Sequence, residues 1–418
     1  MAELSYHRET CRLCNSPTVE CVVPLRPIPV ATPNIDIQAV AQGPEALRRH
    51  TVPLDLYLCR ECGHFQLLDI VNPEVQYTHF RYTTSISLGL PEHFRHMARD
   101  VVARTAPPPG SLVLEIGSND GTLLRAFQEV GLPVLGVDPA ARTAELATAS
   151  GVETLAAFFT TGLARDIRQT RGSAGIVVCN NTLANIDTAG DLIDGVREVL
   201  APEGVFVFET SYGADVVRNT LIDTVYHEHL SYFLVRPLER FFRAHGLELY
   251  DVDHIWTKGG SIRGYVQHAG GPRPRGATLD RMIAAELAEG FDRPEQYAGF
   301  GARIETARRA LSDSLDRHGT ALIGGYGASV GTVTLVHQFD LTQRLGVLFD
   351  DKPLSSGLVG PDYNIPIVHS DEIYTRHPEA VVILAWRYAD PIRSRHRRYL
   401  AEGGRFLMPL PVESAAYA

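Results

Sequence analysis

Short apolar runs of strand length alternate with segments of helical spacing through the middle of the chain. A proline-rich segment at 107–110, whose backbone is stiff, precedes the first run. This alternation is typical of a parallel sheet whose two faces are covered by helices. We predict strands at Leu112–Ile116, Leu132–Val137, Gly175–Cys179 and Val205–Glu209. Helices are predicted between them at Thr122–Glu129 and Ala189–Leu200.

A second block with the same alternation follows a glycine- and proline-rich segment at 270–274. It opens with a helical piece from about Leu279 to His318. Buried strands are then predicted at Ala321–Gly324, Leu345–Phe349 and Ala380–Ala385. We therefore predict an α/β protein with two Rossmann-like, doubly wound units.

Composition limits the class of protein. At 418 residues the chain is long enough for two or three domains, each with its own core. The net charge of −10 argues against a general nucleic-acid binder, which needs a basic face. No apolar run is long enough to span a membrane, and the first ten residues lack the apolar stretch of a secretory signal. We expect a cytoplasmic protein, a monomer or a weak dimer, without nucleic-acid or membrane partners.

Four cysteines form two Cys-x-x-Cys pairs, Cys11/Cys14 and Cys59/Cys62. Each pair presents two thiolates from one tight turn, so two pairs can enclose Zn²⁺ tetrahedrally and leave no open position. Gly63 follows the second pair and permits a sharp turn. Two disulfides or unrelated thiols are the alternative, but zinc is favoured because the chain looks intracellular. We predict a structural zinc-binding module at 1–76, followed by domains at 77–269 and 270–418.

A glycine turn, Glu115-Ile-Gly117-Ser-Asn-Asp-Gly121, follows the first strand of the middle domain. It is not the three-glycine dinucleotide pattern, so it gives little support for NAD. Asp138 ends the second strand, where a carboxylate can accept both hydroxyls of a ribose. These features suit a nucleoside without a pyrophosphate and resemble class I S-adenosylmethionine-dependent methyltransferases. The alternative is a turn that only packs a helix on a strand.

The residues that we expect around this cofactor follow the first three strands. Phe158 or Phe159 is placed to flank the adenine, although a core role is nearly as well supported for each. The full expected set is Glu115, Gly117, Asn119, Asp120, Gly121, Asp138, Pro139, Phe158, Phe159, Asn180 and Asn181.

Tyr226-His-Glu-His229 places four polar side chains behind the fourth predicted strand. The spacing is not His-Glu-x-x-His, so a catalytic metal is not indicated. In isolation the stretch would be read as a surface loop. Behind the fourth strand of a methyltransferase-like sheet, however, it lies where the acceptor binds, and a histidine can act there as a general base.

Taken together, these motifs resemble the sugar C-methyltransferases of antibiotic deoxysugar pathways. The resemblance rests on the cysteine pairs, the Glu115–Gly121 turn, Tyr226–His229, Gly259-Gly-Ser-Ile-Arg263 and Gly325-Tyr-Gly-Ala328. It implies S-adenosylmethionine, a structural Zn²⁺ and a nucleotide-linked 4-keto sugar, with dTDP as the expected nucleotide. The implied reaction removes a proton beside the ketone and methylates the resulting enolate carbon.

The resemblance also implies roles for particular residues. His229 would be the leading base, with Tyr226 and Glu228 positioning it or the keto oxygen. His227 and Tyr82 complete the implied catalytic set. Substrate contacts would come from Tyr82, Asn185, Gly260, Ser261, Arg263 and Tyr326, with the C-terminal domain holding the nucleotide.

Two departures from the family pattern keep other functions open. Asn185 stands where the family usually has a histidine, and an amide cannot accept that proton. Ser329-Val-Gly331 stands where a lysine is common, and the turn after Asp350 lacks the usual basic character. An O- or N-methyltransferase of a related sugar or small metabolite is one alternative. A non-catalytic binding module with the same fold is the other.

Overall fold

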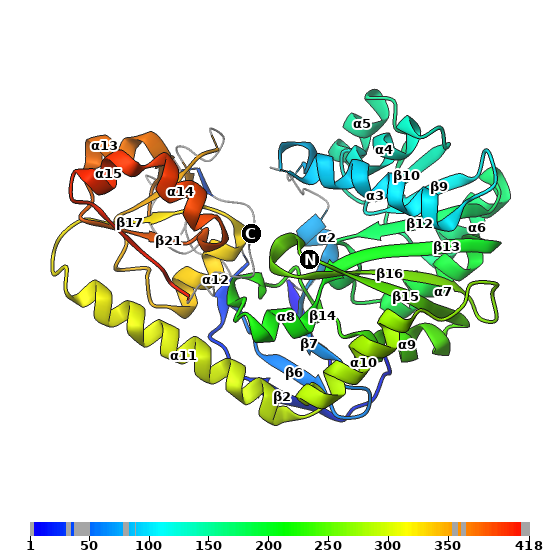
Figure 1. Cartoon of the computed structure of the whole chain (residues 1–418), viewed down its shortest axis with the longest axis horizontal. Coiled ribbons are helices and arrows are strands. Elements are labelled where there is room, and N and C mark those ends of the chain that lie inside the picture. The colour runs from blue at the N-terminus through cyan, green and yellow to red at the C-terminus, as the bar shows by residue number, and fades with distance from the viewer. Residues whose placement is uncertain are drawn as a thin grey trace.

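The computed structural model describes residues 4–30, 35–36, 51–77, 83–87, 89–352, 358–360 and 365–410. In these segments a seven-stranded sheet and a five-stranded sheet lie at opposite ends of the molecule, joined by a four-stranded sheet and a long helix (Figure 1). This arrangement confirms the predicted α/β class with two doubly wound units. Among the described helices, none is both long and apolar enough to cross a lipid bilayer.

The central sheet has the strand order β11-β10-β9-β12-β13-β16-β15. The first five strands run parallel, β16 runs antiparallel to them, and β15 at the edge runs in the direction of the first five; the sequence pattern did not reveal these last two strands. The strands are β9 (Leu112–Ile116), β10 (Val134–Asp138), β11 (Thr154–Ala156), β12 (Ala174–Asn180), β13 (Leu200–Ser211), β15 (Leu247–Ile255) and β16 (Ser261–His268). Its helices are α3 (Leu90–Thr105), α4 (Thr122–Glu129), α5 (Ala141–Ala149), α6 (Thr161–Arg171), α7 (Ala189–Val199), α8 (Gly213–Arg218) and α9 (Val235–Ala244).

The N-terminal sheet includes one strand, β14 (Ser231–Tyr232), from the middle of the chain. Its order is β14-β7-β6-β2, and β14 begins two residues after His229. The other strands are β2 (Val19–Val23), β6 (Leu56–Cys59) and β7 (Phe65–Leu67), and the smaller pairs are β1 (Ser5–His7) with β8 (Asp69–Val71), β3 (Ile28–Pro29) with β5 (Thr51–Val52), and β4 (Ile35–Asp36) with β19 (Leu358–Val359). The short helix α2 (Pro73–Tyr77) follows. The N-terminal module is therefore built into the middle domain through β14.

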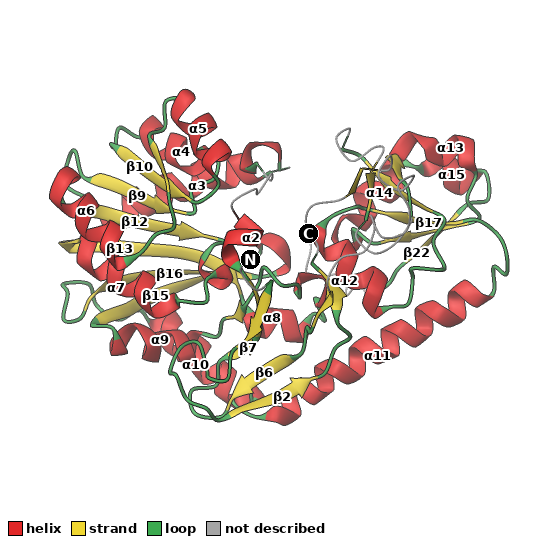
Figure 2. Cartoon of the chain, turned by 180° about the vertical axis from the view of Figure 1, so that it is seen from behind, coloured by secondary structure: helices red, strands yellow, loops and turns green. Residues whose placement is uncertain are grey.

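The C-terminal sheet is parallel throughout, in the order β20-β18-β17-β21-β22. Its strands are β17 (Ile323–Tyr326), β18 (Val347–Asp350), β20 (Ile367–His369), β21 (Ala380–Ile383) and β22 (Arg405–Leu407). Its helices are α12 (Val330–Gln338), α13 (Ile373–Arg376), α14 (Ala389–Arg395) and α15 (Arg397–Ala401). The helical piece predicted at 279–318 is two helices, α10 (Ala277–Glu289) and α11 (Pro294–Asp316), because Gly290 ends the first with a left-handed backbone. Figure 2 shows α11 spanning the distance between the two large sheets.

Helix α12 contacts both other parts of the molecule. The Thr334 hydroxyl donates to the Val225 carbonyl oxygen at 2.7 Å, just before Tyr226. The Gln338 amide donates to the Arg26 carbonyl oxygen at 2.7 Å in the N-terminal module. The C-terminal unit is thereby fixed against the segment that leads to His229.

The two doubly wound units repeat one carboxylate arrangement. At the end of β10, the Asp138 carboxylate accepts hydrogen bonds from the backbone N–H groups of Asn119 and Ala140, at 2.8 and 2.9 Å. At the end of β18, the Asp350 carboxylate accepts from the N–H groups of Ala328 and Lys352, both at 2.8 Å. Each carboxylate therefore closes a turn at the carboxyl edge of its sheet, where open α/β sheets bind their ligands.

Candidate functional site

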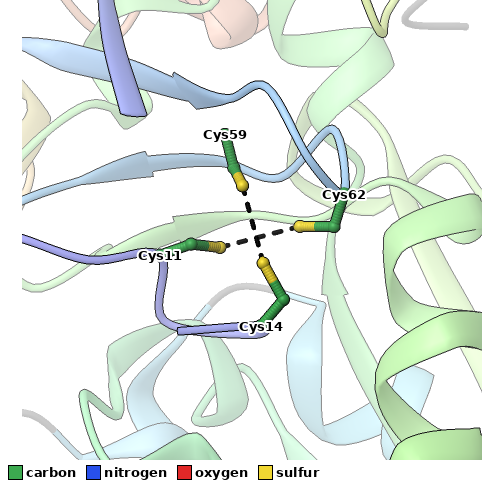
Figure 3. A group of neighbouring side chains, drawn as sticks. All are labelled: Cys11, Cys14, Cys59 and Cys62. Carbon is green, nitrogen blue, oxygen red and sulfur yellow. Dashed lines mark hydrogen bonds between the residues drawn. The ribbon is translucent and has the colours of Figure 1, made fainter. Parts of the chain in front are cut away.

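The four predicted metal ligands converge on one point (Figure 3). All four Sγ atoms lie within 4.8 Å of one another, with 3.6 Å between Cys11 and Cys62 and 3.6 Å between Cys14 and Cys59. A tetrahedral Zn²⁺ with Zn–S bonds of about 2.3 Å requires sulfur atoms about 3.8 Å apart. All four are free thiols, so the disulfide alternative is not realised, and the geometry fits a closed zinc site.

Arg12, inside the first cysteine pair, links this knuckle to the middle domain. Its side chain is fully buried, and Nε donates to the Asp187 carboxylate at 3.0 Å. Its Nη1 donates to the Leu230 carbonyl oxygen at 2.9 Å, and Nη2 donates to the Leu67 carbonyl oxygen at 3.0 Å. The knuckle and the chain immediately after His229 are therefore held by one buried guanidinium.

The residues expected at the cofactor surround the carboxyl ends of β9 and β10. Glu115 is 3 % exposed, and burial together with the charges of Asp138 and Asp120 raises its pKa well above the ordinary range. Its Oε2 atom has no hydrogen-bond partner, which leaves a buried polar atom available to a ligand. Asp138 keeps its carboxylate at the same edge. These features fit a nucleoside cofactor, S-adenosylmethionine in particular.

The glycines of the turn pack closely against neighbouring segments. The space beside Gly117, where a Cβ would stand, is filled by Thr182, and the space beside Gly121 is filled by Val152. Both glycines are thus required by packing, and both also have a left-handed backbone, with φ of +73° and +74°. Their predicted contacts to the cofactor stay predictions, while Asp138 and Glu115 lie at the ligand edge.

Asn119 and Asp120 use their side chains to hold the short segment η2 (Thr84–Ile86) against the turn. The Asn119 Oδ1 atom accepts from the Thr84 N–H at 2.9 Å, and the Asp120 Oδ2 atom accepts from the Ser85 N–H at 2.9 Å. If either side chain also contacts the cofactor, it does so while it accepts a hydrogen bond from the backbone of this segment.

The two phenylalanines expected near the adenine, Phe158 and Phe159, differ in their exposure to solvent. Phe159 packs against the helix α7, where it would meet a Cβ at Gly195 within 2.9 Å, whereas Phe158 is 42 % exposed beyond the end of β11. Phe158 is thus the better candidate to flank an adenine. Pro139 follows Asp138. Asn180 is the last residue of β12 and Asn181 follows it, and the Oδ1 atom of Asn180 has no hydrogen-bond partner.

His229 and Tyr226 form a compact pair behind β13. The Tyr226 hydroxyl lies 2.9 Å from His229 Nε2, and the two ring centroids are 4.1 Å apart. His229 Nδ1 lies 2.8 Å from the Thr224 carbonyl oxygen, which can only accept, so Nδ1 carries the proton and Nε2 is the basic nitrogen. Burial, then the charges of Lys258 and Arg387, lower the pKa of His229 to about 4. The imidazole is therefore neutral at ordinary pH, with Nε2 free of a proton.

The two residues between them face elsewhere. His227 is 2 % exposed, and its Nε2 lies 3.1 Å from the Val52 carbonyl oxygen and 3.3 Å from that of Pro53. It therefore ties the loop to the N-terminal module, and the catalytic role expected of it stays a prediction that this contact does not support. Glu228 is 7 % exposed, and its charge acts on Tyr226 and on Tyr77.

Tyr77 interacts with two of the predicted site residues, Asn185 and Glu228, and is a candidate that the sequence reasoning missed. It ends α2 and shares a side-chain hydrogen bond with Asn185, while burial and the Glu228 charge raise its pKa well above the ordinary range. The expected tyrosine, Tyr82, lies outside the described residues. Tyr77 stands five residues ahead of Tyr82 in the same segment, so a second tyrosine was visible in the sequence.

Glu209, at the end of β13, organises a second polar group. Arg263 binds it through Nε at 2.7 Å and Nη2 at 2.6 Å, and His93 from α3 lies 2.8 Å away. Burial alone would raise the pKa of Glu209, but hydrogen bonding from His93 and the Arg263 charge lower it. The strand-end argument that selected Asp138 applies equally to Glu209, which we had not singled out.

This pairing changes the picture of the expected phosphate contacts. The Arg263 side chain is 5 % exposed and held by Glu209, so a phosphate would have to compete with that carboxylate. The Ser261 hydroxyl donates to the Thr257 carbonyl oxygen at 3.1 Å, and Gly260 lies against the Asp215 side chain. Tyr326 is 2 % exposed, and its hydroxyl donates to Asp351 at 2.9 Å inside the C-terminal unit. All four residues have internal contacts, so their expected contacts to the substrate stay predictions that would have to compete with these partners.

Three family models match the chain. A "Putative zinc binding domain" matches residues 11–77, a "Methyltransferase domain" matches residues 91–252, and a "C-methyltransferase C-terminal domain" matches residues 256–411. Over 407 residues the chain is 32% identical to C-methyltransferase NovU from Streptomyces niveus, with 96% of each chain covered.

Among solved structures, the chain is similar to an S-adenosylmethionine-dependent methyltransferase from Clostridium acetobutylicum ATCC 824, with 11% identity, 43% of this chain, 92% of that chain and a TM-score of 0.35. It is also similar to magnesium protoporphyrin IX methyltransferase from Synechocystis PCC 6803 with bound S-adenosylhomocysteine, with 14% identity, 46% of this chain, 90% of that chain and a TM-score of 0.34. Both likenesses are confined to less than half of the chain.

Proposed function

This chain belongs to the C-methyltransferase family, and from that premise we propose that it methylates a nucleotide-linked 4-keto deoxysugar at a ring carbon beside the ketone. The protein is an S-adenosylmethionine-dependent methyltransferase with a structural zinc site. The acceptor, its dTDP carrier and the residue roles below are our proposal. The relative NovU is named a C-methyltransferase, which supports transfer to carbon.

The Tyr226–His229 pair is the observation that carries the mechanism. Methylation at carbon requires a base, because the carbon beside the ketone must lose a proton before it can attack. His229 Nε2 is unprotonated and its hydrogen-bond partner is a hydroxyl that can turn aside or donate elsewhere. We therefore assign proton removal to His229 and orientation of the imidazole to Tyr226.

The cofactor edge fits the rest of the reaction. Asp138 would hold the ribose, Phe158 would flank the adenine, and Glu115 would face the remainder of the ligand. When bound, S-adenosylmethionine supplies an electrophilic methyl group, so no catalytic metal is needed. The protein holds the acceptor carbon in line and keeps His229 beside it.

Tyr77, Asn185 and Glu228 are proposed to orient the acceptor. Asn185 stands where the family usually has a histidine, and it bonds Tyr77 and cannot move a proton. In this chain, then, proton removal rests on His229 alone. The amide and the phenol can still donate hydrogen bonds to a keto oxygen or a sugar hydroxyl.

We propose that the nucleotide lies at the C-terminal unit. The Asp350 turn repeats the Asp138 arrangement, which supports a nucleoside sugar at the carboxyl edge of β18. With the boundaries that we propose, the zinc module at 1–76 and the methyltransferase domain at 77–269 would flank the sugar, and the domain at 270–418 would hold its carrier.

The test is turnover with a panel of nucleotide-linked 4-keto sugars, followed by location of the new methyl group by NMR. A carbon-bound methyl beside the ketone supports the proposal, and a methyl on oxygen or nitrogen favours the alternative acceptor. Cofactor binding without turnover of any panel member would instead favour a binding module. The His227→Asn variant is the matched control, since it changes a neighbouring imidazole that faces the N-terminal module.

A further inference from the structure

Lys258 lies in a turn whose backbone is held in an unfavourable conformation. Its φ is +56° and its ψ is 22°, in the left-handed region that residues with a side chain rarely occupy. Such strain persists only where the surrounding structure fixes it, and it is concentrated at functional sites. The turn η5 (Thr257–Gly259) joins β15 to β16.

Contacts on both sides fix this turn. A Cβ on Gly259 would lie 3.0 Å from Leu221 and 3.5 Å from the Arg387 side chain, so two segments close against it. Leu221 precedes the loop that carries His229. Arg387 belongs to η8 (Trp386–Tyr388), which follows β21 of the C-terminal unit. The backbone at Lys258 is therefore set where the middle domain and the C-terminal unit meet.

The register of the sheet places the turn beyond the ligand-binding edge. Ser261, the first residue of β16, pairs with Ser211, the last residue of β13. Since β16 runs antiparallel to β13, the residues just before Ser261 extend past the carboxyl end of β13. Acceptors of open α/β sheets bind at this edge. The Lys258 charge also acts on His229, which places the ammonium within electrostatic range of the proposed base.

The neighbouring cations are neutralised, whereas Lys258 is not. Arg263 pairs with Glu209 at 2.6 Å, and Arg387 pairs with the buried Asp223 at 2.7 Å. Within the part of the chain that the structure describes, Lys258 forms no ion pair or hydrogen bond. The residue as a whole is exposed, but burial of its ammonium lowers the pKa to about 8; the Glu209 charge raises the pKa and the Arg387 charge lowers it. The group thus carries one uncompensated positive charge beside the base.

We propose that the Lys258 ammonium stabilises the negative oxygen that forms on the acceptor when His229 removes the neighbouring proton. This inference rests on the proposed function. The C–H bond breaks, its proton goes to His229 Nε2, and the electron pair moves through the carbonyl group onto the oxygen. Lys258 keeps its proton and donates a hydrogen bond to that oxygen, so charge develops where a cation already stands.

Residue choice agrees with this role. The chain holds only two lysines, Lys258 and Lys352, among 39 lysine and arginine residues. An ammonium is a compact charge that can approach a single oxygen, whereas the planar guanidinium suits paired contacts to carboxylate or phosphate. Arg263 and Arg387 make contacts of that second kind with protein carboxylates.

The test compares Lys258→Met and Lys258→Arg with the full-length wild type in three measurements. These are kcat, exchange of the α-proton of the keto sugar with deuterated solvent, and affinity for dTDP by calorimetry. Removing one oxyanion donor typically lowers kcat by about 10²–10³. We expect Lys258→Met to lose that factor in kcat, to slow the exchange in parallel and to bind dTDP as the wild type does. Lys258→Arg should recover part of the loss.

Other results overturn the inference. If Lys258→Met weakens dTDP binding and leaves exchange unchanged, the ammonium binds the diphosphate and not the keto oxygen. If kcat and exchange are both unchanged, it binds neither. A wild type that neither methylates nor exchanges any keto sugar would contradict the proposed function itself, and this inference with it.

A second variant separates chemistry from folding. Lys258→Gly removes the amine and relieves the left-handed backbone, so its fold should be retained. Added ethylamine should restore part of its turnover but none of that of His229→Asn. No restoration in a folded Lys258→Gly protein would count against the inference.

Discussion

The guanidinium of Arg12 donates a hydrogen bond of 2.9 Å to the carbonyl oxygen of Leu230, the residue that follows His229. Arg12 follows the zinc ligand Cys11, and Leu230 follows the proposed base His229. This hydrogen bond therefore connects the metal site to the proposed base. The zinc module therefore takes part in holding the active-site loop, besides stabilising its own fold.

Replacing Arg12 should disturb the loop as well as stability. In Arg12→Met the Leu230 and Leu67 carbonyl groups each lose one hydrogen-bond donor, and Asp187 loses one of its two cations, so we expect the free energy of unfolding to fall by about 3 kcal/mol. Denaturant titration measures this change, and kcat should fall with zinc content unchanged. Arg60→Met is the matched control, because its 3.6 Å pair with Glu20 is exposed and should be worth less than about 1 kcal/mol. Equal stability of the two variants would contradict the coupling.

Zinc should accompany the purified protein at about one ion per chain, because closed thiolate sites contribute directly to folding. Metal analysis of a folded, active preparation measures the stoichiometry. Stripping the ion with a chelator should lower the melting temperature and expose the N-terminal module to proteolysis. A zinc content below about a fifth of an equivalent in active protein would rule the site out.

Asp138→Ala should weaken S-adenosylmethionine binding by about 1.5–3 kcal/mol, since a charged hydrogen-bond acceptor is lost. Calorimetry with the isolated cofactor checks this value. Asp350→Ala is the control, because it removes the same arrangement from the other unit and should leave cofactor affinity as it is. If both variants bind the cofactor like the wild type, the ribose assignment to Asp138 fails.

His229→Asn should lower turnover by about 10²–10⁴ while leaving cofactor binding intact, because a positioned general base is lost. It should also stop exchange of the acceptor proton with deuterated solvent. His227→Asn should keep the exchange, although the loss of its bonds to Val52 and Pro53 should reduce stability. Exchange at the wild-type rate in His229→Asn would transfer the role to Tyr226.

Activity should persist at acid pH further than an ordinary histidine base permits. Burial and the charges of Lys258 and Arg387 lower the pKa of His229 to about 4, against the Thr224 carbonyl contact, which raises it. Because the neutral imidazole is the base, kcat/KM should stay flat as pH falls through about 6.5 and decline only near pH 4. The pH profile of kcat/KM measures this, over the range where the folded protein remains stable. An acid limb centred near pH 6.5 would show that the working base has an unperturbed pKa.

The sequence alone determined the architecture and the metal site. Paired cysteines, a glycine turn and strand-end carboxylates are local patterns, and their chemistry follows from spacing along the chain. The Cys11–Cys62 cluster, the Asp138 turn and the adjacency of Tyr226 and His229 were all predictable for this reason.

Only the tertiary structure decided which polar residues face one another. Tyr77 and Asn185 are far apart in sequence, and so are Arg263 and Glu209, yet each pair meets because strands and loops from different parts of the chain end at the same sheet edge. The sequence did not predict that Thr182 packs against Gly117 or that His227 contacts the Val52 carbonyl oxygen. The partner of a side chain depends on which segments pack against it. Lys258 belongs to no motif that the sequence analysis used. Only the tertiary structure shows that Arg387, which packs against the same turn, is paired with Asp223 whereas Lys258 has no such partner among the described residues.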